Sequence, residues 1–170
     1  LFDIFGSGIV VPGTGFALHD RGAGFTLDQN LPNTVAPGKR PFHTLIPGFV
    51  TKPGPNSSPD GTGDQPWMSF GLMGGAMQAQ GHAQFLINLL VFGMDLQKAM
   101  DVGRFRHMGG AHVIVEPAIA DSVITQLRAM GHDVTLGGAR QFGGSQAIIR
   151  LGHGYEAGSD PRKDGHAAGY

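Results

Sequence analysis

Two adjacent glycines, Gly74 and Gly75, stand where this sequence most readily offers main-chain chemistry. An apolar run at residues 67–73, which follows the Pro- and Gly-rich segment 53–66, predicts a strand. After the glycines, the apolar residues Phe85, Leu86, Leu89 and Leu90 recur at helical spacing. The glycine pair is therefore expected at a strand-to-helix junction. Because glycine has no Cβ, its N–H groups are accessible there, at the positive end of the helix dipole.

A junction of this kind can bind a phosphate, a carboxylate or the oxyanion that forms during acyl transfer. A tight turn that requires positive φ explains the same two glycines equally well. Both interpretations stay open on the glycines alone.

Local patterns predict short strands on either side of a central helical block. The main helix is expected at 78–92, where apolar residues recur at helical spacing until Gly93 ends the pattern. Asp95 is expected to cap a second, short helix at 96–102. The other expected elements are strands at 9–11, 16–19, 45–51, 112–116, 134–136 and 146–151 and a helix at 121–130. The strand at 9–11 is expected to be buried. Pro47 places 45–51 at an edge or a bulge, and 53–66 is expected to connect a hairpin. This arrangement is typical of an α+β fold.

Composition limits the classes of function. The 170 residues are 41% apolar and only 15% charged, with a formal net charge of −1 and no cysteine. A near-neutral chain gives no electrostatic basis for binding nucleic acid or an anionic membrane. Disulfides and thiolate chemistry are excluded, and no apolar run reaches membrane-spanning length. So little charge indicates that part of the surface is covered by a partner.

Few other residues suggest chemistry by themselves. The eight histidines show no metal-ligand spacing, so neither a metal nor a cofactor is expected. His43 adjoins Thr44 and is treated as a binding candidate rather than as half of a catalytic dyad. Arg21 lies in a Gly-rich loop, where it is either a solvated charge or part of a site. The segment Gly6-Ser7-Gly8 lacks the Lys-Ser/Thr of a phosphate loop and leads into a strand.

Six motifs in order carry a resemblance to the small subunit of the gamma-glutamyltransferase family. They are Phe5-Gly6-Ser7-Gly8-Ile9-Val10, Pro37-Gly38-Lys39-Arg40-Pro41, Gly71-Leu72-Met73-Gly74-Gly75, Arg104-Phe105, Ser159-Asp160-Pro161-Arg162 and Ala168-Gly169-Tyr170. The resemblance covers essentially the whole chain, and residues 1–170 are therefore expected to be a single small-subunit domain.

The resemblance implies an N-terminal-nucleophile hydrolase with an αββα sandwich, to which this chain contributes one part of a two-subunit domain. A precursor of such a protein cuts itself into a large and a small subunit and exposes a threonine nucleophile. Because Leu1 has no nucleophilic side chain, the chain is expected to lack the short N-terminal segment that carries this threonine. Gly74 and Gly75 match the glycines that supply the oxyanion-hole N–H groups.

The resemblance implies a partner subunit, while the composition and the lack of an export signal in the sequence bear on other partners and on location. The expected partners are the large subunit and a small-molecule amide, with a dimer of heterodimers as one assembly, and without nucleic acid or membrane. The expected location is the cytoplasm, with the periplasm or secretion as alternatives.

Departures from the family pattern bear on the substrate. Phe2, Arg21 and Gly24 stand where true gamma-glutamyl enzymes hold the substrate's α-amino group, and an arginine there repels an ammonium. His43 and Thr44 match a serine pair that helps to hold the α-carboxylate. The sequence looks closest to the branch with oxamate amidohydrolase and glutaryl-cephalosporin acylases.

The resulting hypothesis is an amidohydrolase that binds a carboxylated acyl group through Arg21, Thr44 and His43. The alternatives are a genuine gamma-glutamyl transferase or hydrolase acting on glutathione-like substrates, and a non-catalytic subunit that stabilises its partner.

Overall fold

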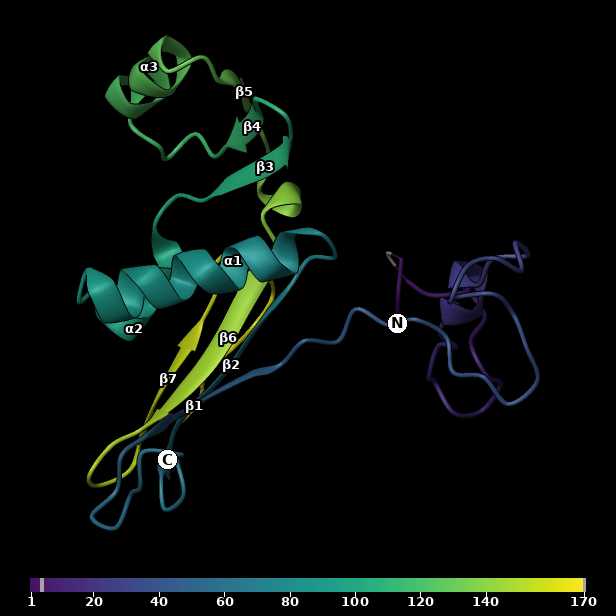
Figure 1. Cartoon of the computed structure of the whole chain (residues 1–170), viewed down its shortest axis with the longest axis horizontal. Coiled ribbons are helices and arrows are strands. Elements are labelled where there is room, and N and C mark those ends of the chain that lie inside the picture. Colours follow the sequence, from purple (N-terminus) through teal and green to yellow (C-terminus); the bar gives the residue numbers. More distant parts are fainter. Residues whose placement is uncertain (4, 170) are drawn as a thin grey trace. The chain divides into compact units, whose positions relative to one another are not determined.

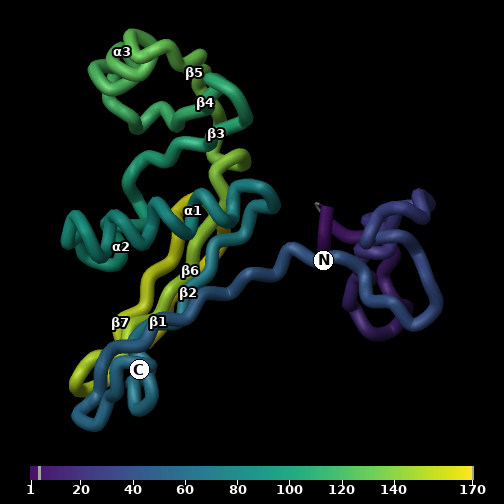
Figure 2. The backbone as a smooth tube through the Cα atoms, in the orientation of Figure 1, coloured from purple at the N-terminus to yellow at the C-terminus, as the bar shows by residue number. Residues whose placement is uncertain are grey.

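The computed structural model describes residues 1–3 and 5–169, in two compact units (Figures 1 and 2). The first unit is Leu1–Leu45 and the second is Ile46–Tyr170. Ile4 and Tyr170, the latter from the closing Ala168-Gly169-Tyr170 motif, lie outside the described residues. That residues 1–170 act as one small-subunit domain stays a prediction.

The first unit has little regular structure. Its one described helical turn is η1 (Arg21–Gly24), and its described β-bridges are Val10–Ala17 and Thr26–Thr34. The predicted strands at 9–11 and 16–19 are therefore wrong: the two segments share a single bridge, and Ile9 is 59% exposed instead of buried. A tight turn joins them and neither has a further described strand beside it, so no sheet buries their side chains.

The second unit contains a four-stranded antiparallel sheet in the order β1-β2-β6-β7. These strands are β1 (Gly48–Lys52), β2 (Gln65–Met73), β6 (Gly144–Arg150) and β7 (Tyr155–Ser159). β1 and β2 form the predicted hairpin around 53–66, and β1 is an edge strand as Pro47 indicated. β7 was not predicted, because Tyr-Glu-Ala-Gly-Ser has no apolar alternation.

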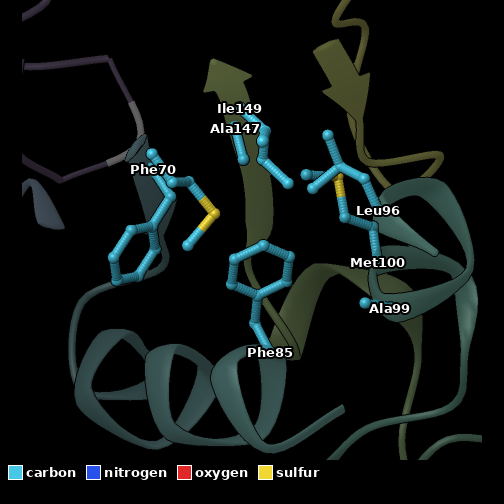
Figure 3. Close-up of a cluster of buried hydrophobic side chains, with 8 residues drawn as sticks. Phe70, Phe85, Leu96, Ala99, Met100, Ala147 and Ile149 are labelled. Atoms are coloured by element: carbon cyan, nitrogen blue, oxygen red, sulfur yellow. The ribbon is translucent and has the colours of Figure 1, made fainter. Parts of the chain in front are cut away.

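Helices α1 (Met77–Leu86) and α2 (Leu96–Asp101) cover one face of this sheet (Figure 1). Alternate residues of β2 and β6 point towards them, so side chains from the strands meet Phe85 of α1 and Met100 of α2 (Figure 3). The buried members of this core are Met68, Phe70, Phe85, Leu96, Ala99, Met100, Ala147 and Ile149. Asp95 caps α2 as predicted, accepting from the Lys98 N–H at 2.8 Å.

The predicted helix 78–92 is wrong in its second half. α1 ends at Leu86, and Ile87–Val91 forms a wider π-helical turn, η2, in which the Phe92 N–H donates to the Ile87 carbonyl. In this turn Leu89 packs against the core while Val91 is 72% exposed. The spacing of apolar residues cannot distinguish a single π-helical turn from a regular α-helix, because the hydrogen bonds of the two span five and four residues.

A second, three-stranded sheet has the order β3-β4-β5. β3 (Phe105–Gly109) runs antiparallel to β4 (His112–Val115), which is parallel to β5 (Asp133–Leu136). α3 (Asp121–Ala129) connects β4 to β5 and packs on this sheet through Ile124. The elements predicted at 112–116, 121–130 and 134–136 are confirmed, whereas β3 was not predicted because it has no apolar run.

Two glutamine side chains pair with the outer edge of β3. The Gln84 amide accepts from the Phe105 N–H at 3.0 Å and donates to the Phe105 carbonyl at 2.8 Å. Gln80, one helical turn earlier, makes the same two bonds with His107, at 2.7 and 3.0 Å. α1 thus lies between the four-stranded sheet and β3 (Figure 1) and holds both.

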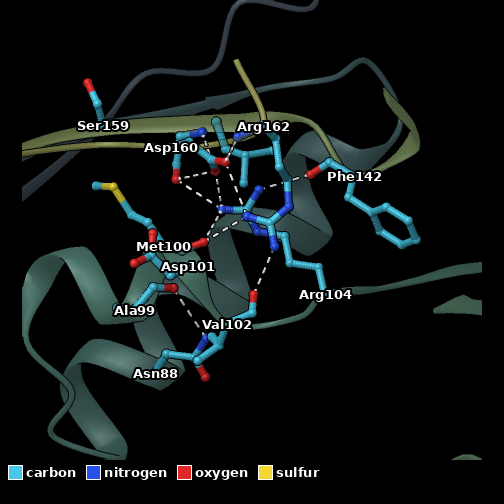
Figure 4. Close-up of polar contacts among 12 residues, drawn as sticks. Asn88, Ala99, Met100, Asp101, Val102, Arg104, Phe142, Ser159, Asp160 and Arg162 are labelled. Carbon is cyan, nitrogen blue, oxygen red and sulfur yellow. Dashed lines mark hydrogen bonds and ion pairs between the residues drawn. The ribbon is translucent and has the colours of Figure 1, made fainter. Parts of the chain in front are cut away.

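A buried ionic network ties the C-terminal segment to the core (Figure 4). Arg104, 2% exposed, contacts Asp160, 1% exposed, at 2.5 Å. Arg162 pairs with Glu116 at 2.5 Å and with Asp160 at 3.1 Å. Burial alone would raise the pKa of Asp160, but hydrogen bonds from the backbone N–H groups of Arg162 and Ser145 and the charge of Arg104 outweigh it and lower that pKa.

Across the described residues, none of the helices is both long enough and apolar enough to span a membrane.

Candidate functional site

The glycine pair forms the predicted strand-to-helix junction. β2 ends at Met73 and α1 begins at Met77, so Gly74 and Gly75 lie in the corner between them. Both have positive φ, +146° and +59°. Their carbonyls accept from the first N–H groups of the helix, those of Met77 and Gln78, at 3.2 and 3.0 Å.

The N–H groups of these two glycines take no part in the hydrogen bonds of the described residues. No atom of the described residues accepts a hydrogen bond from either of them. Gly75 is exposed and Gly74 is half-buried, and nothing lies within 4 Å of where a Cβ on Gly75 would be. Two N–H groups without an acceptor among the described residues therefore lie at the start of a ten-residue helix, where the helix dipole is positive.

The rear of the corner is tightly packed. A Cβ on Gly74 would lie 2.9 Å from the Cα of Gly143, which itself has φ +70°. Below this contact, Leu72, Met77 and Phe142 form a buried cluster with Ile114. The Phe142 carbonyl accepts from Arg104 at 3.0 Å, so the ionic network supports this side of the corner (Figure 4).

The first unit brings together two of the residues expected to bind the substrate, Arg21 and Thr44, and places Phe2 beside them. The Arg21 Nη1 donates to the Thr44 Oγ1 at 3.2 Å, and the guanidinium lies over the Phe2 ring, 5.0 Å from its centroid. No carboxylate of the described residues pairs with Arg21. The remaining guanidinium N–H groups can therefore receive a carboxylate in the planar, bidentate geometry that arginine favours.

His43 and Gly24 are less involved. The His43 ring is exposed, and its Nδ1 accepts from the Leu45 N–H at 3.2 Å, so this histidine stabilises its own loop. Gly24 is exposed at the end of η1. Of the predicted binding residues, the structure therefore places Arg21 and Thr44 in contact and records no contact between them and His43.

One histidine beside the glycine corner was not singled out from the sequence. The His82 Nε2 of α1 accepts from the Leu72 N–H at 2.9 Å, and its ring packs on Phe70 with centroids 4.9 Å apart. Burial lowers the pKa of His82 below 6.5. The sequence of α1 carries no signal that separates His82 from its polar neighbours, because Gln78, Gln80 and Gln84 alternate with smaller or apolar residues in the same way.

Possible metal ligands do not gather in this structure: among the described residues, no three His, Asp or Glu side chains lie close enough to hold an ion.

A family match, sequence relatives and solved structures all relate this chain to the gamma-glutamyltranspeptidase family. The family described as gamma-glutamyltranspeptidase matches residues 2–170. The oxamate amidohydrolase proenzyme of Klebsiella pneumoniae subsp. pneumoniae is 34% identical over 178 residues, covering 100% of this chain and 32% of the relative. The glutathione hydrolase-like YwrD proenzyme of Bacillus subtilis is also 34% identical, covering 99% of this chain and 32% of that protein. The chain thus spans about a third of the length of these relatives.

Solved structures agree. The cephalosporin acylase from Bacillus halodurans superposes with a TM-score of 0.82 at 42% identity, over 97% of this chain and 30% of that one. The gamma-glutamyltranspeptidase from Pseudomonas nitroreducens complexed with L-DON gives a TM-score of 0.77 at 28% identity, over 98% and 88% of the two chains. The expected α+β, N-terminal-nucleophile hydrolase fold is confirmed by these likenesses.

Proposed function

Because this chain belongs to the gamma-glutamyltranspeptidase family, we propose that it is the small subunit of an amidohydrolase acting on a small carboxylated acyl group. The observation that carries the proposal is the pair of unpaired N–H groups at Gly74 and Gly75, at the start of α1. Relatives that are named as proenzymes and extend well beyond this chain support a precursor that supplies a large subunit.

The proposed chemistry follows the family's threonine nucleophile, supplied by the precursor. The threonine hydroxyl attacks the amide carbon while its own α-amino group takes the proton, and the carbonyl oxygen becomes an oxyanion. The N–H groups of Gly74 and Gly75 donate to that oxygen. The C–N bond then breaks, the proton passes to the leaving amine, and a threonyl ester remains until water hydrolyses it to the free acid.

Arg21 and Thr44 are proposed to hold the carboxylate of the acyl group. The guanidinium is oriented by the Thr44 hydroxyl and the Phe2 ring and keeps N–H groups unused within the described residues. A substrate with an α-ammonium, such as a gamma-glutamyl compound, would meet a like charge. The names of two similar proteins, oxamate amidohydrolase and cephalosporin acylase, support the carboxylated class.

The large subunit is proposed to cover the open face of the four-stranded sheet. The strand residues that point away from α1 and α2 include Phe49, Ile148 and Tyr155, which are 63%, 50% and 74% exposed. They line a shallow groove of about 370 Å³ with Trp67 and Ser69. An apolar sheet face of this kind packs on another sheet in the expected αββα sandwich.

The test is a substrate comparison with the complete precursor after self-cleavage. The value of kcat/KM is measured for oxamate, for a glutaryl amide and for a gamma-glutamyl amide, and the acyl-enzyme is sought by mass spectrometry. The expected result is preference for oxamate or the glutaryl amide. Preference for the gamma-glutamyl amide would overturn the substrate assignment, and hydrolysis of none would favour a non-catalytic subunit.

A further inference from the structure

The end of β2 is held by a side chain where a strand partner is missing. The ladder between β1 and β2 ends at the pair Gly48–Phe70. Two residues further on, the Leu72 N–H lies beyond β1, and it donates to the His82 Nε2 at 2.9 Å. His82 therefore accepts the hydrogen bond that a carbonyl of a neighbouring strand would otherwise accept, near the end of β2 and just before the glycine corner.

Only one form of the imidazole can accept this bond. Nε2 must be without a proton, so the ring is neutral and carries its proton on Nδ1. Next to it, Gly81 lets α1 approach closely: a Cβ there would lie 2.5 Å from the Leu72 Cδ1. Close packing and a directional hydrogen bond thus hold the same residue of β2 against α1.

From these contacts we propose that His82 is a positioning residue for the oxyanion donors, the N–H groups of Gly74 and Gly75. Leu72 lies two residues before Gly74, and His82 lies on the second turn of the helix that follows Gly75. The hydrogen bond therefore joins the strand before the two glycines to the helix after them. The inference deepens the proposed function and rests on it.

The corner needs such support because of its own sequence. Two consecutive glycines have the widest choice of backbone conformation. An oxyanion donor is effective only when its N–H already points to where the charge develops. A displacement of about 1 Å in a catalytic arrangement can cost on the order of 100-fold in rate.

The experiment compares His82→Leu with His82→Gln in the complete, processed enzyme. Leucine removes the acceptor, whereas the glutamine Oε1 reaches about as far as Nε2 and can accept the Leu72 N–H. His112→Leu is the matched control, since it removes a histidine bond to Thr135 in the other sheet. We measure kcat and KM for the preferred amide, the Kd of the product acid, and inhibition by the boronic acid analogue of the acyl group, which forms a tetrahedral adduct.

The expected signature separates positioning from general stability. His82→Leu should lower kcat about 10- to 100-fold and weaken the boronate similarly, with KM and product-acid Kd unchanged. His82→Gln should restore most of kcat, and His112→Leu should match the wild type. If His82→Leu does not fold, His82→Asn, whose amide is too short to reach Leu72, replaces it in the same comparison.

Two results would overturn the inference, and they differ. An active wild type with unchanged kcat in the variant lacking the acceptor removes the role of His82 and leaves the proposed function standing. A processed wild type that hydrolyses no amide removes both, and this appears before any variant is made.

Discussion

Alanine substitutions at the two glycines should have unequal effects on catalysis, although the glycines are neighbours. At Gly75, φ is +59° and a new Cβ meets nothing within 4 Å. Alanine can occupy that left-handed region at about 1–2 kcal/mol, and the N–H stays in place. At Gly74, φ is +146°, a region open essentially only to glycine, and the Cβ would lie 2.9 Å from the Gly143 Cα.

The magnitude follows from which atoms must move. In Gly74→Ala the methyl group meets backbone rather than a flexible side chain, so the peptide plane itself must turn. Loss of one oxyanion donor lowers kcat by about 100- to 1,000-fold, equivalent to about 2.7–4 kcal/mol of barrier. Gly75→Ala should lower the unfolding free energy by about 1–2 kcal/mol and leave kcat within about threefold of the wild type.

Steady-state kinetics on the two processed variants, with urea unfolding alongside, distinguish these outcomes. Expression of each precursor is followed by a check of self-cleavage, so that only processed enzyme is compared. Equal values of kcat for Gly74→Ala and Gly75→Ala would refute the reasoning, because the structure predicts that alanine displaces the backbone at Gly74 and leaves it in place at Gly75.

Other parts of the molecule make further predictions. Arg21→Ala should lower kcat/KM for a carboxylated amide by about 10- to 100-fold, from the loss of a charge-assisted hydrogen bond, and should leave a neutral amide of the same size unaffected. Asp160→Asn should lower the free energy of unfolding, measured in urea, by about 3–5 kcal/mol, because it leaves buried arginine charge uncompensated. In the wild type, the stability that the ionised Asp160 contributes is present above pH 3.8 and is lost as pH falls through the lowered pKa of Asp160. Since burial lowers the pKa of His82, the folded protein binds fewer protons than the unfolded chain, so stability should decline as pH falls from 6.5 towards that lowered pKa. His82→Gln should remove this part of the pH dependence of the melting temperature between about pH 5.5 and 7.5, one unit on either side of the pKa of an ordinary histidine; the same pH dependence in the wild type and in this variant would contradict the prediction. Gln80→Ala and Gln84→Ala should each lower the free energy of unfolding by about 1 kcal/mol and speed the hydrogen exchange of backbone amides in β3. Equal exchange rates in the wild type and the variants would argue against the edge pairing.

The glycine corner was predictable because all of its signals are local. An apolar run, two glycines and a helical repeat follow one another within about two dozen residues, and each indicates the local backbone without reference to distant residues. The cap at Asp95 and the hairpin around 53–66 were predictable for the same reason. A shared role for Arg21 and Thr44 was expected only through the resemblance, and the hydrogen bond between them, across 23 residues of sequence, was not predicted.

Interactions between distant residues were not predictable. β3 forms because β4 supplies its strand partner, while Gln80 and Gln84 pair with its other edge, and β7 forms because β6 supplies its partner. Neither strand shows an apolar alternation of its own. The network of Arg104 with Asp160 joins residues 56 apart, and no pattern within either segment identifies the partner.

The amides of Gln80 and Gln84 have a consequence beyond stability. An uncovered strand edge is a template on which the strands of other molecules add, and this is the first step towards aggregates. In β3 the places where a foreign backbone would attach at Phe105 and His107 are already taken by side chains from the same molecule. A helix thereby protects this edge as lysines and prolines protect other exposed edges, and another strand can pair with β3 at these two residues only after α1 has moved away.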